Sequence, residues 1–148
     1  MAEEEWLAME MYSKSSKKTR VEEGFRGKMY QCTADKLTIG YGLNLESGIT
    51  EEEARVILEM RLGKIERYLA RKYSFYNNMN EARQTVIDDM VYQLGPEGFS
   101  KFKKTIDLLY ADNYIDASKE MLDSKWAKSD SPSRARRNSD VIRTGLAR

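Results

Sequence analysis

The spacing of apolar residues changes near residue 50, and this change restricts the chain to a fold with a small sheet and many helices. Between residues 25 and 50, apolar side chains alternate with polar or small ones, which is the period of a strand. The tripeptide Ala34–Asp35–Lys36 separates two such runs and predicts a tight hairpin. From residue 51 onward, apolar residues recur every three or four positions, as they do on one helix face. We therefore expect an α+β fold that is mainly helical.

Capping residues divide the second part of the chain into helices. Thr50 and Glu53 form a capping-box pattern, which predicts a long helix over about 51–72. Asn80 can cap the next helix, and Gly95–Pro96 should end it. Shorter helices are expected at about 99–111 and 113–125. Ser131–Pro132 then begins a last helix, with serine as the cap and proline at the first helical position.

These elements predict one domain made of three segments. Residues 1–17 form an N-terminal extension, in which residues 3–16 have a weak helical pattern. Residues 18–72 form a small lobe that holds the hairpin and the long connecting helix, after a short helix that Gly24 ends. Residues 73–148 form a helical lobe. The long helix is long enough to join the two lobes.

Histidine is absent from the sequence and cysteine occurs once, as Cys32. A single cysteine excludes an internal disulfide and a zinc site built from several cysteines. The absence of histidine excludes a Ser-His-Asp triad, a Cys-His dyad and a histidine general base. Acid–base chemistry near neutral pH would therefore depend on carboxylates, cysteine, lysine, tyrosine or bound water.

Charge is spread unevenly, although the net formal charge is only +1. The first hundred residues have an acidic excess, and residues 101–148 have a basic excess. A basic surface attracts a polyanion, which could be a nucleic acid, an anionic membrane or an anionic cell wall. No nucleic-acid-reading motif accompanies the charge, so we rank a DNA-binding function low. The acidic start resembles neither a signal peptide nor a membrane anchor, so we expect synthesis in a cytoplasm.

Three residues of the small lobe are candidates for chemistry. Glu23 ends a predicted helix, where the negative end of the helix dipole favours the protonated acid that a general acid requires. Cys32 and Thr38 are six residues apart across the hairpin, so they can be cross-strand neighbours. Each signal alone also fits an ordinary structure: a solvated helix end, a buried thiol or a strand residue beside glycines.

Taken together, the segment RVEEGFRGKMYQCTADKLTIGYGLNL, residues 20–45, resembles the active-site segment of phage-type lysozymes, the endolysins of glycoside hydrolase family 24. The family pattern is Glu, eight residues, Asp or Cys, five residues, Thr, and Glu23, Cys32 and Thr38 match it without a gap. Residues 90–102 resemble the family's central helix and the loop after it, and residues 124–145 resemble its C-terminal signature. The resemblance covers about residues 18–146.

This resemblance implies a two-lobed fold and hydrolysis of the β-1,4 bond between N-acetylmuramic acid and N-acetylglucosamine in peptidoglycan, with inversion. Glu23 would protonate the leaving oxygen, and Thr38 would hold a water on the opposite face of the sugar. Cys32 stands where many members have aspartate. Because a free thiol has a pKa of about 8.5, we expect Cys32 either to be partly ionised or to act mainly by polarising water with Thr38. A covalent route through a glycosyl–cysteine is a less favoured alternative.

The resemblance also implies supporting residues, all matched by position. Arg134 would pair with Glu23, and Arg137 would pair with Glu22. Gln93 and Trp126 would pack and hydrogen-bond behind the acid. The substrate would be contacted by Asn44, Tyr92, Gln93, Thr105 and Glu120.

The expected biological role is an endolysin that lyses a bacterial host and acts on peptidoglycan as a monomer, with no metal, cofactor or nucleic acid. It would wait in the host cytoplasm until a holin-like membrane protein gave it access to the wall. Two alternatives keep the substrate: a catalytically weak wall-binding phage component, and a lytic transglycosylase that uses Glu23 without a positioned water.

Overall fold

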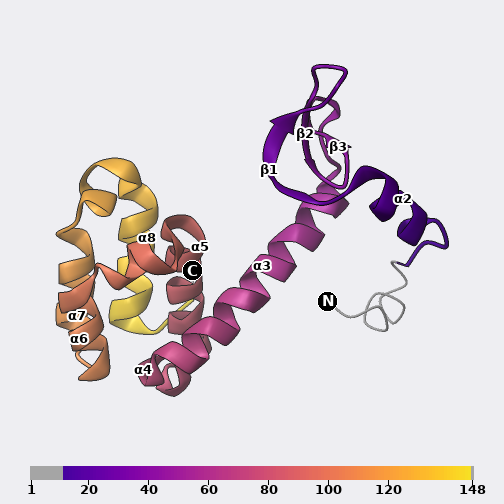
Figure 1. The fold of residues 1–148 in the computed structure, drawn as a ribbon. Coiled ribbons are helices and arrows are strands. Elements are labelled where there is room, and N and C mark those ends of the chain that lie inside the picture. Colours follow the sequence, from indigo (N-terminus) through magenta and orange to yellow (C-terminus); the bar gives the residue numbers. More distant parts are fainter. Residues whose placement is uncertain (1–11, 148) are drawn as a thin grey trace. The chain divides into compact units, whose positions relative to one another are not determined.

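The computed structural model describes residues 12–147, and its first part holds a short helix followed by a small sheet (Figure 1). The sheet has three antiparallel strands in the order β1-β2-β3. Glycines Gly40 and Gly42 have positive φ where β2 turns into β3. The elements are α2 (Ser16–Glu23), β1 (Arg26–Gln31), β2 (Leu37–Gly40), β3 (Leu43–Asn44) and the 3-10 turn η1 (Leu45–Ser47).

The hairpin between β1 and β2 closes through a three-residue loop, Thr33 to Asp35. The Cys32 amide donates to the Lys36 carbonyl at 2.9 Å, and the Asp35 amide donates to the Cys32 carbonyl at 2.8 Å. Asp35 has a φ of 60°, the left-handed conformation that a bulged three-residue hairpin loop requires. The predicted loop began one residue later, because Lys36 is already paired with Cys32.

The second part of the chain is helical, and it contains the hydrophobic core. Its buried apolar residues extend from Leu69 to Ile142 and include Phe99, Met121 and Trp126. The elements are α3 (Glu51–Lys72), α4 (Ser74–Asn78), α5 (Glu81–Ser100), α6 (Lys103–Tyr110), α7 (Tyr114–Leu122), the π-helical turn η2 (Trp126–Asp130) and α8 (Pro132–Thr144). This content confirms the expected mixed, mainly helical fold.

The chain divides into two compact units, residues 1–54 and residues 55–148. The division falls inside α3, whereas the sequence analysis assigned that whole helix to the small lobe. The reason is packing: Ile65, Tyr68 and Leu69 of α3 belong to the core of the second unit or pack against it. The expectation for residues 3–16 falls mostly outside the described residues; residues 12–15 precede α2 and are not helical.

Two predicted helix starts form by different means. The capping box at α3 is confirmed: Glu53 N–H donates to Thr50 Oγ1 at 3.2 Å, and Thr50 N–H donates to Glu53 Oε1 at 2.8 Å. At α8, Pro132 occupies the first turn as predicted, but the Ser131 side chain makes no cap hydrogen bond. Its hydroxyl accepts from Gln93 Nε2 instead, so a long-range contact replaces the local one.

The break at Gly95 is also confirmed, with one difference. Gly95 has φ 78° and ψ 163°, which no helix contains, so α5 is interrupted there. The chain then resumes helical geometry from Pro96 to Ser100, because proline suits the first position of a new helical turn. Within residues 12–147, no helix is both long and apolar enough to cross a membrane.

Candidate active-site residues

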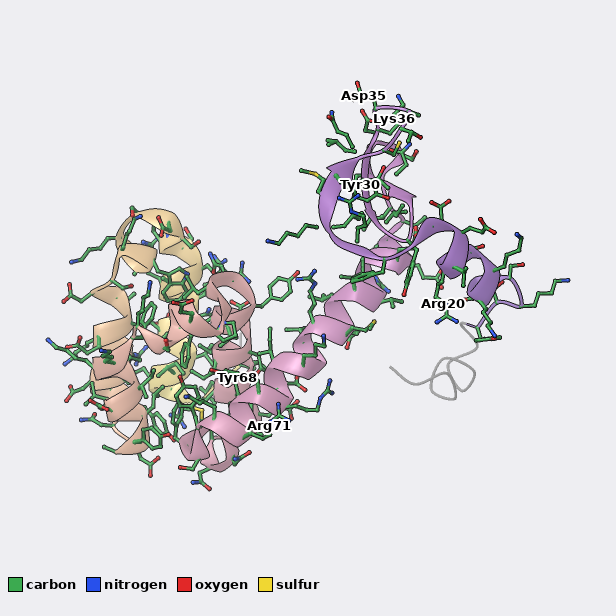
Figure 2. The ribbon with its side chains drawn as sticks, viewed as in Figure 1. Arg20, Tyr30, Asp35, Lys36, Tyr68 and Arg71 are labelled. Carbon is green, nitrogen blue, oxygen red and sulfur yellow. The ribbon has the colours of Figure 1, made fainter. Side chains whose placement is uncertain are left out.

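The strand register gathers three polar side chains into a row across one face of the sheet. Tyr30 of β1 faces Thr38 of β2, and Thr38 faces Asn44 of β3. Residues directly opposite in a sheet share a face, and so does Cys32, which lies two positions after Tyr30. Figure 2 places Asp35 and Lys36 at the tip of this hairpin and Tyr30 farther along β1. The predicted proximity of Cys32 and Thr38 is therefore present in the hairpin.

Backbone amides surround the Cys32 sulfur. Hydrogen bonding by the amides of Lys36 and Ala34 holds the pKa of the Cys32 thiol below its ordinary value. Burial opposes this shift, and the Thr38 hydroxyl supports it. Each N–H directed at sulfur stabilises the thiolate more than the thiol. The turn thus favours the ionised form of the only cysteine in the chain.

Thr38 is the buried member of the group, with 3% of its surface exposed. Its hydroxyl donates to the Lys36 carbonyl at 2.8 Å. A hydroxyl has one proton but two acceptor lone pairs, so it can donate to either the carbonyl or the sulfur at one time. Thr38 is therefore held at a defined position while it keeps acceptor capacity for a water.

Glu23 ends α2, and its carboxylate lies against the turn between β2 and β3. A Cβ atom placed on Gly42 would be 2.6 Å from Cδ and 3.1 Å from Cγ of Glu23. The rings of Phe25 and Tyr41, one just after the helix and one in the turn, lie 5.6 Å apart. The first unit therefore brings the end of α2 against the same small sheet that holds Cys32 and Thr38.

Asn44 caps a helical turn in addition to lying beside Thr38 in the row of polar side chains. Its side-chain oxygen accepts a hydrogen bond from the Glu46 amide at 3.0 Å and so caps η1. The amide nitrogen of the same side chain can still donate to a ligand. The substrate role predicted for Asn44 therefore rests on its place in the row beside Thr38.

The predicted ion pairs of Arg134 with Glu23 and of Arg137 with Glu22 join the two units, and they stay predictions. Within the second unit, Arg134 makes a bidentate pair with Asp89 of α5. Asn138 also donates to Asp89, at 2.9 Å, and together these partners hold the pKa of Asp89 below its ordinary value despite burial. Glu22 pairs with Lys18 on its own helix, with Oε1 of Glu22 3.5 Å from Nζ of Lys18.

Two of the predicted substrate residues lie in one groove of the second unit. Thr105 and Glu120 line it from α6 and α7, and Trp126 closes its inner side. Lysines contribute the outer wall, at positions Lys101, Lys103, Lys104 and Lys125. A groove with hydroxyl, carboxylate and ammonium groups beside aromatic rings can bind a polar ligand by hydrogen bonds and stacking.

Gln93 and Trp126 hydrogen-bond to each other, and their expected place behind Glu23 stays a prediction. The Trp126 indole N–H donates to Gln93 Oε1 at 3.0 Å, and Gln93 in turn donates to Ser131. Tyr92, the residue before Gln93, lies elsewhere: it is 45% exposed and lines a different groove, with Ile57, Met60 and Pro96. The structure therefore separates Tyr92 from the groove of Thr105 and Glu120.

Sequence reasoning missed two contacts of the site residues. Asp89 was not identified as the partner of Arg134, and Gly42 was not identified as the neighbour of Glu23. The glycines at positions 40 and 42 do indicate a turn, but nothing in the sequence shows which side chain covers Gly42. Among the described residues, no group of three or more Asp, Glu or Cys side chains is placed to hold a metal ion.

Comparison with known proteins identifies the family of the chain. A probable T4-type lysozyme of Dictyostelium discoideum is 26% identical over 156 aligned positions, covering 85% of this chain and 91% of that protein. An endolysin of Acyrthosiphon pisum secondary endosymbiont phage 1 is 30% identical over 72% of this chain. The pre-baseplate central spike protein Gp5 of Enterobacteria phage T4 is 27% identical over 85% of this chain, which corresponds to 27% of the spike protein. Since the phage lysozyme profile matches residues 20–141, the chain belongs to the phage lysozyme family.

Proposed function

We propose that the protein is an endolysin-type lysozyme that hydrolyses the β-1,4 bond between N-acetylmuramic acid and N-acetylglucosamine in peptidoglycan. The observation that carries this proposal is the sheet of the first unit. It holds a thiol with a lowered pKa, a buried threonine hydroxyl and a glutamate carboxylate at the three positions of the family motif. The family match and the names of the endolysin and lysozyme relatives support it.

Glu23 supplies the proton in this mechanism. The protonated carboxyl donates to the glycosidic oxygen, so that the bond to the anomeric carbon breaks and the leaving sugar departs as an alcohol. The carboxylate that remains takes a proton back from solvent after the products leave. The end of α2 suits this role because it places the carboxyl group against the turn between β2 and β3.

Cys32 and Thr38 handle the attacking water. Thr38 accepts a hydrogen bond from the water, and the Cys32 thiolate takes its proton as the oxygen bonds to the anomeric carbon. One water is consumed for each bond cleaved, and the thiol returns its proton to solvent. Attack on the face opposite the leaving group inverts the anomeric carbon. A lowered thiol pKa is what this step needs, since only the thiolate can accept the proton.

The remaining candidates would hold the glycan strand. Asn44 stands next to Thr38 in the row, so its free amide N–H groups can donate to the sugar near the cleaved bond. Thr105 and Glu120 share a groove that can bind another part of the polymer, and the exposed ring of Tyr92 can stack on a sugar. In biological terms, the enzyme would lyse a bacterial host from its cytoplasm after a holin-like protein opened the membrane.

The central test is clearing of a purified peptidoglycan suspension. The wild-type protein should reduce turbidity, and Glu23→Gln should lower the rate by about a hundredfold or more, because the amide has no proton to donate. Glu52→Gln, on an exposed glutamate in the first turn of α3, is the matched control and should clear at the wild-type rate. Equal rates for wild type and Glu23→Gln would overturn the mechanism.

The products distinguish hydrolysis from transglycosylation. Hydrolysis leaves a reducing end on the muramic acid, whereas a lytic transglycosylase leaves a 1,6-anhydro ring that is lighter by one water. Mass spectrometry of the released fragments separates the two. Because Thr38 and the Cys32 thiolate provide a place for a water, we expect reducing ends only.

A second candidate function is suggested by one relative, the phage T4 spike protein. A phage component that binds the wall with little turnover would bind peptidoglycan in a pull-down assay without clearing it. The lowered pKa of Cys32 favours the enzyme, because a binding module has no use for a thiolate at that position.

A further inference from the structure

Gly42 differs from the other glycines of the small sheet in what surrounds it. Gly40, Gly42 and Gly48 all have φ near +70°, so backbone conformation alone favours glycine at each. A Cβ on Gly40 or Gly48 would meet nothing within 4 Å. A Cβ on Gly42 would overlap the carboxylate of Glu23, with Cδ at 2.6 Å. Gly42 therefore has a second requirement for glycine, and that requirement comes from a candidate catalytic side chain.

The absence of a side chain at Gly42 leaves room for the carboxylate. The carboxylate of Glu23 stands in the space that any larger residue at 42 would fill, so the bare α-carbon of Gly42 forms one wall of its site. The Phe25–Tyr41 ring pair, at 5.6 Å, joins the segment after α2 to the same turn. This ring contact joins residues next to Gly42 and close to Glu23, so it keeps the turn near the end of α2.

We propose that Gly42 is a positioning residue, which sets the place of the Glu23 carboxylate against the sheet that holds Thr38. The inference rests on the proposed function, in which Glu23 is the proton donor. A general acid must meet the leaving oxygen at hydrogen-bond distance, and a displacement of about 1 Å can cost about a hundredfold in rate. Gly42 acts through Glu23 and touches no substrate atom.

The overlap predicted for alanine at 42 can be relieved by a side-chain rotation, which costs little free energy. The atoms in the way are the far end of a flexible side chain, so Glu23 can rotate and the backbone can stay in place. The Gly42→Ala protein should therefore lose only the stability that the positive φ costs an alanine, while the carboxylate of Glu23 moves. This separates an effect on rate from an effect on folding.

The test compares Gly42→Ala with Gly48→Ala, which has the same backbone strain and open space around its Cβ. Stability is measured by urea unfolding, and kcat and KM are measured on soluble peptidoglycan fragments. Both variants should lose similar stability. Gly42→Ala should lose about a hundredfold in kcat with KM changed less than about threefold, whereas Gly48→Ala should keep the wild-type kcat. Equal kcat values for the two variants would overturn the proposal.

Two further variants cover the other outcomes. If Gly42→Ala does not fold, adding Glu23→Ala should restore folding, because it removes the colliding atoms; failure to restore it would refute the contact. The Glu23→Gln enzyme separates this proposal from the proposed function. If Glu23→Gln is inactive while Gly42→Ala is fully active, only the positioning role is wrong. If Glu23→Gln is fully active, the proposed function itself is wrong.

Discussion

Cys32 shows how a turn can stabilise the ionised form of a weak acid. A carboxylate is ionised at neutral pH without help, whereas a thiol needs its charge stabilised. Here the amides of Lys36 and Ala34 supply that stabilisation, and the hydroxyl of Thr38 adds to it. The same loop closes the hairpin through the backbone groups of Cys32, Lys36 and Asp35, so one turn both holds the chain and directs amides at the sulfur.

Cys32 should react with iodoacetamide at lower pH than an unstructured thiol. Only the thiolate is alkylated, so the rate should rise as pH passes through the lowered pKa and level off above it. Because the chain has one cysteine, labelling followed by mass spectrometry reports this residue alone. The urea-unfolded protein is the reference, and its rate should rise at higher pH.

Alkylation and a substitution connect this titration to activity. The alkylated enzyme should lose wall clearing, because the bulky adduct fills the place of the water. Thr38→Val should move the alkylation profile to higher pH, since it removes the hydroxyl that supports the thiolate. If folded and unfolded protein showed the same profile, the role assigned to the turn amides would be wrong.

At the scale of elements, polar contacts join α5 to its neighbours. Asp89 binds Arg134 and Asn138 of α8. Arg83 donates to the carbonyl of Ile142 at 2.8 Å, near the end of α8, and its guanidinium lies 3.7 Å from the centroid of the Tyr114 ring. These contacts satisfy carbonyls at a helix end while they join separate helices.

Asp88 is a different case, because it is a buried carboxyl that forms no ion pair with any residue in the described range 12–147. It is 7% exposed and accepts a hydrogen bond from the Tyr76 hydroxyl of α4 at 2.8 Å. Burial raises the pKa of Asp88 to about 6, and Glu66 of α3 adds to the increase. The groove beside Asp88 is also lined by Arg67, Glu81, Gln84 and Thr85. The guanidinium of Arg67 lies back along α3, with Nη1 3.3 Å from a Cβ built on Gly63.

Asp88→Asn should stabilise the protein above neutral pH. The folded-state pKa of about 6 exceeds the unfolded value of about 3.9, so the folded state binds the proton more tightly. The contribution of Asp88 to the free energy of unfolding is therefore largest below about pH 4. It falls as the pH rises to about 6 and stays low above that pH. The variant has no such titration, and asparagine can still accept from Tyr76. Urea unfolding should show a gain of about 2 kcal/mol at pH 7.5 and little difference at pH 4.

Glu66→Gln is the companion variant for this prediction. It removes the neighbouring charge that helps to raise the pKa of Asp88, so the effect of Asp88→Asn at pH 7.5 should become smaller in its background. An unchanged effect would show that burial alone accounts for the shift. A loss of stability in Asp88→Asn at pH 7.5 would contradict the assignment of Asp88 as a destabilising buried charge.

At the scale of the whole molecule, the two units are very unequal in buried surface. The core residues from Leu69 to Ile142 all belong to the second unit. Among residues 12–54, Thr38 is the only one that is buried. The first unit holds the candidate catalytic residues, and so the chemistry is placed on the part of the chain with the least hydrophobic support.

Native-state hydrogen exchange should therefore separate the two units. Amides of β1 and β2 should exchange through openings that cost at least about 2 kcal/mol less than those of α5 and α8, because few apolar contacts must be broken. Mass spectrometry of pepsin fragments measures both regions in one experiment. Uniform protection across the chain would mean that the first unit receives support that its own buried residues do not provide.

Much of the architecture followed from local rules. The capping box at Thr50, the break at Gly95 and the strand alternation around β2 depend on hydrogen bonds or periods within a few residues. Such patterns can be read from neighbouring letters of the sequence. The prediction for Ser131 was incomplete because its hydroxyl serves Gln93, which is 38 positions away and belongs to another helix.

The sequence by itself determined the class of fold, the membership of a lysozyme family and the exclusion of histidine chemistry, because periods, motif spacing and residue types are properties of the linear chain. Only the tertiary structure decided that two turn amides surround the Cys32 sulfur, that Gly42 adjoins the Glu23 carboxylate and that Arg134 pairs with Asp89. Each of those contacts depends on the angle at which a turn or helix returns the chain. For Gly42 and Arg134 the partner comes from a separate element of the fold, so no short stretch of sequence specifies the contact. For Cys32 the partners are near in sequence, but the direction of their amides is set by the backbone angles that the folded hairpin adopts.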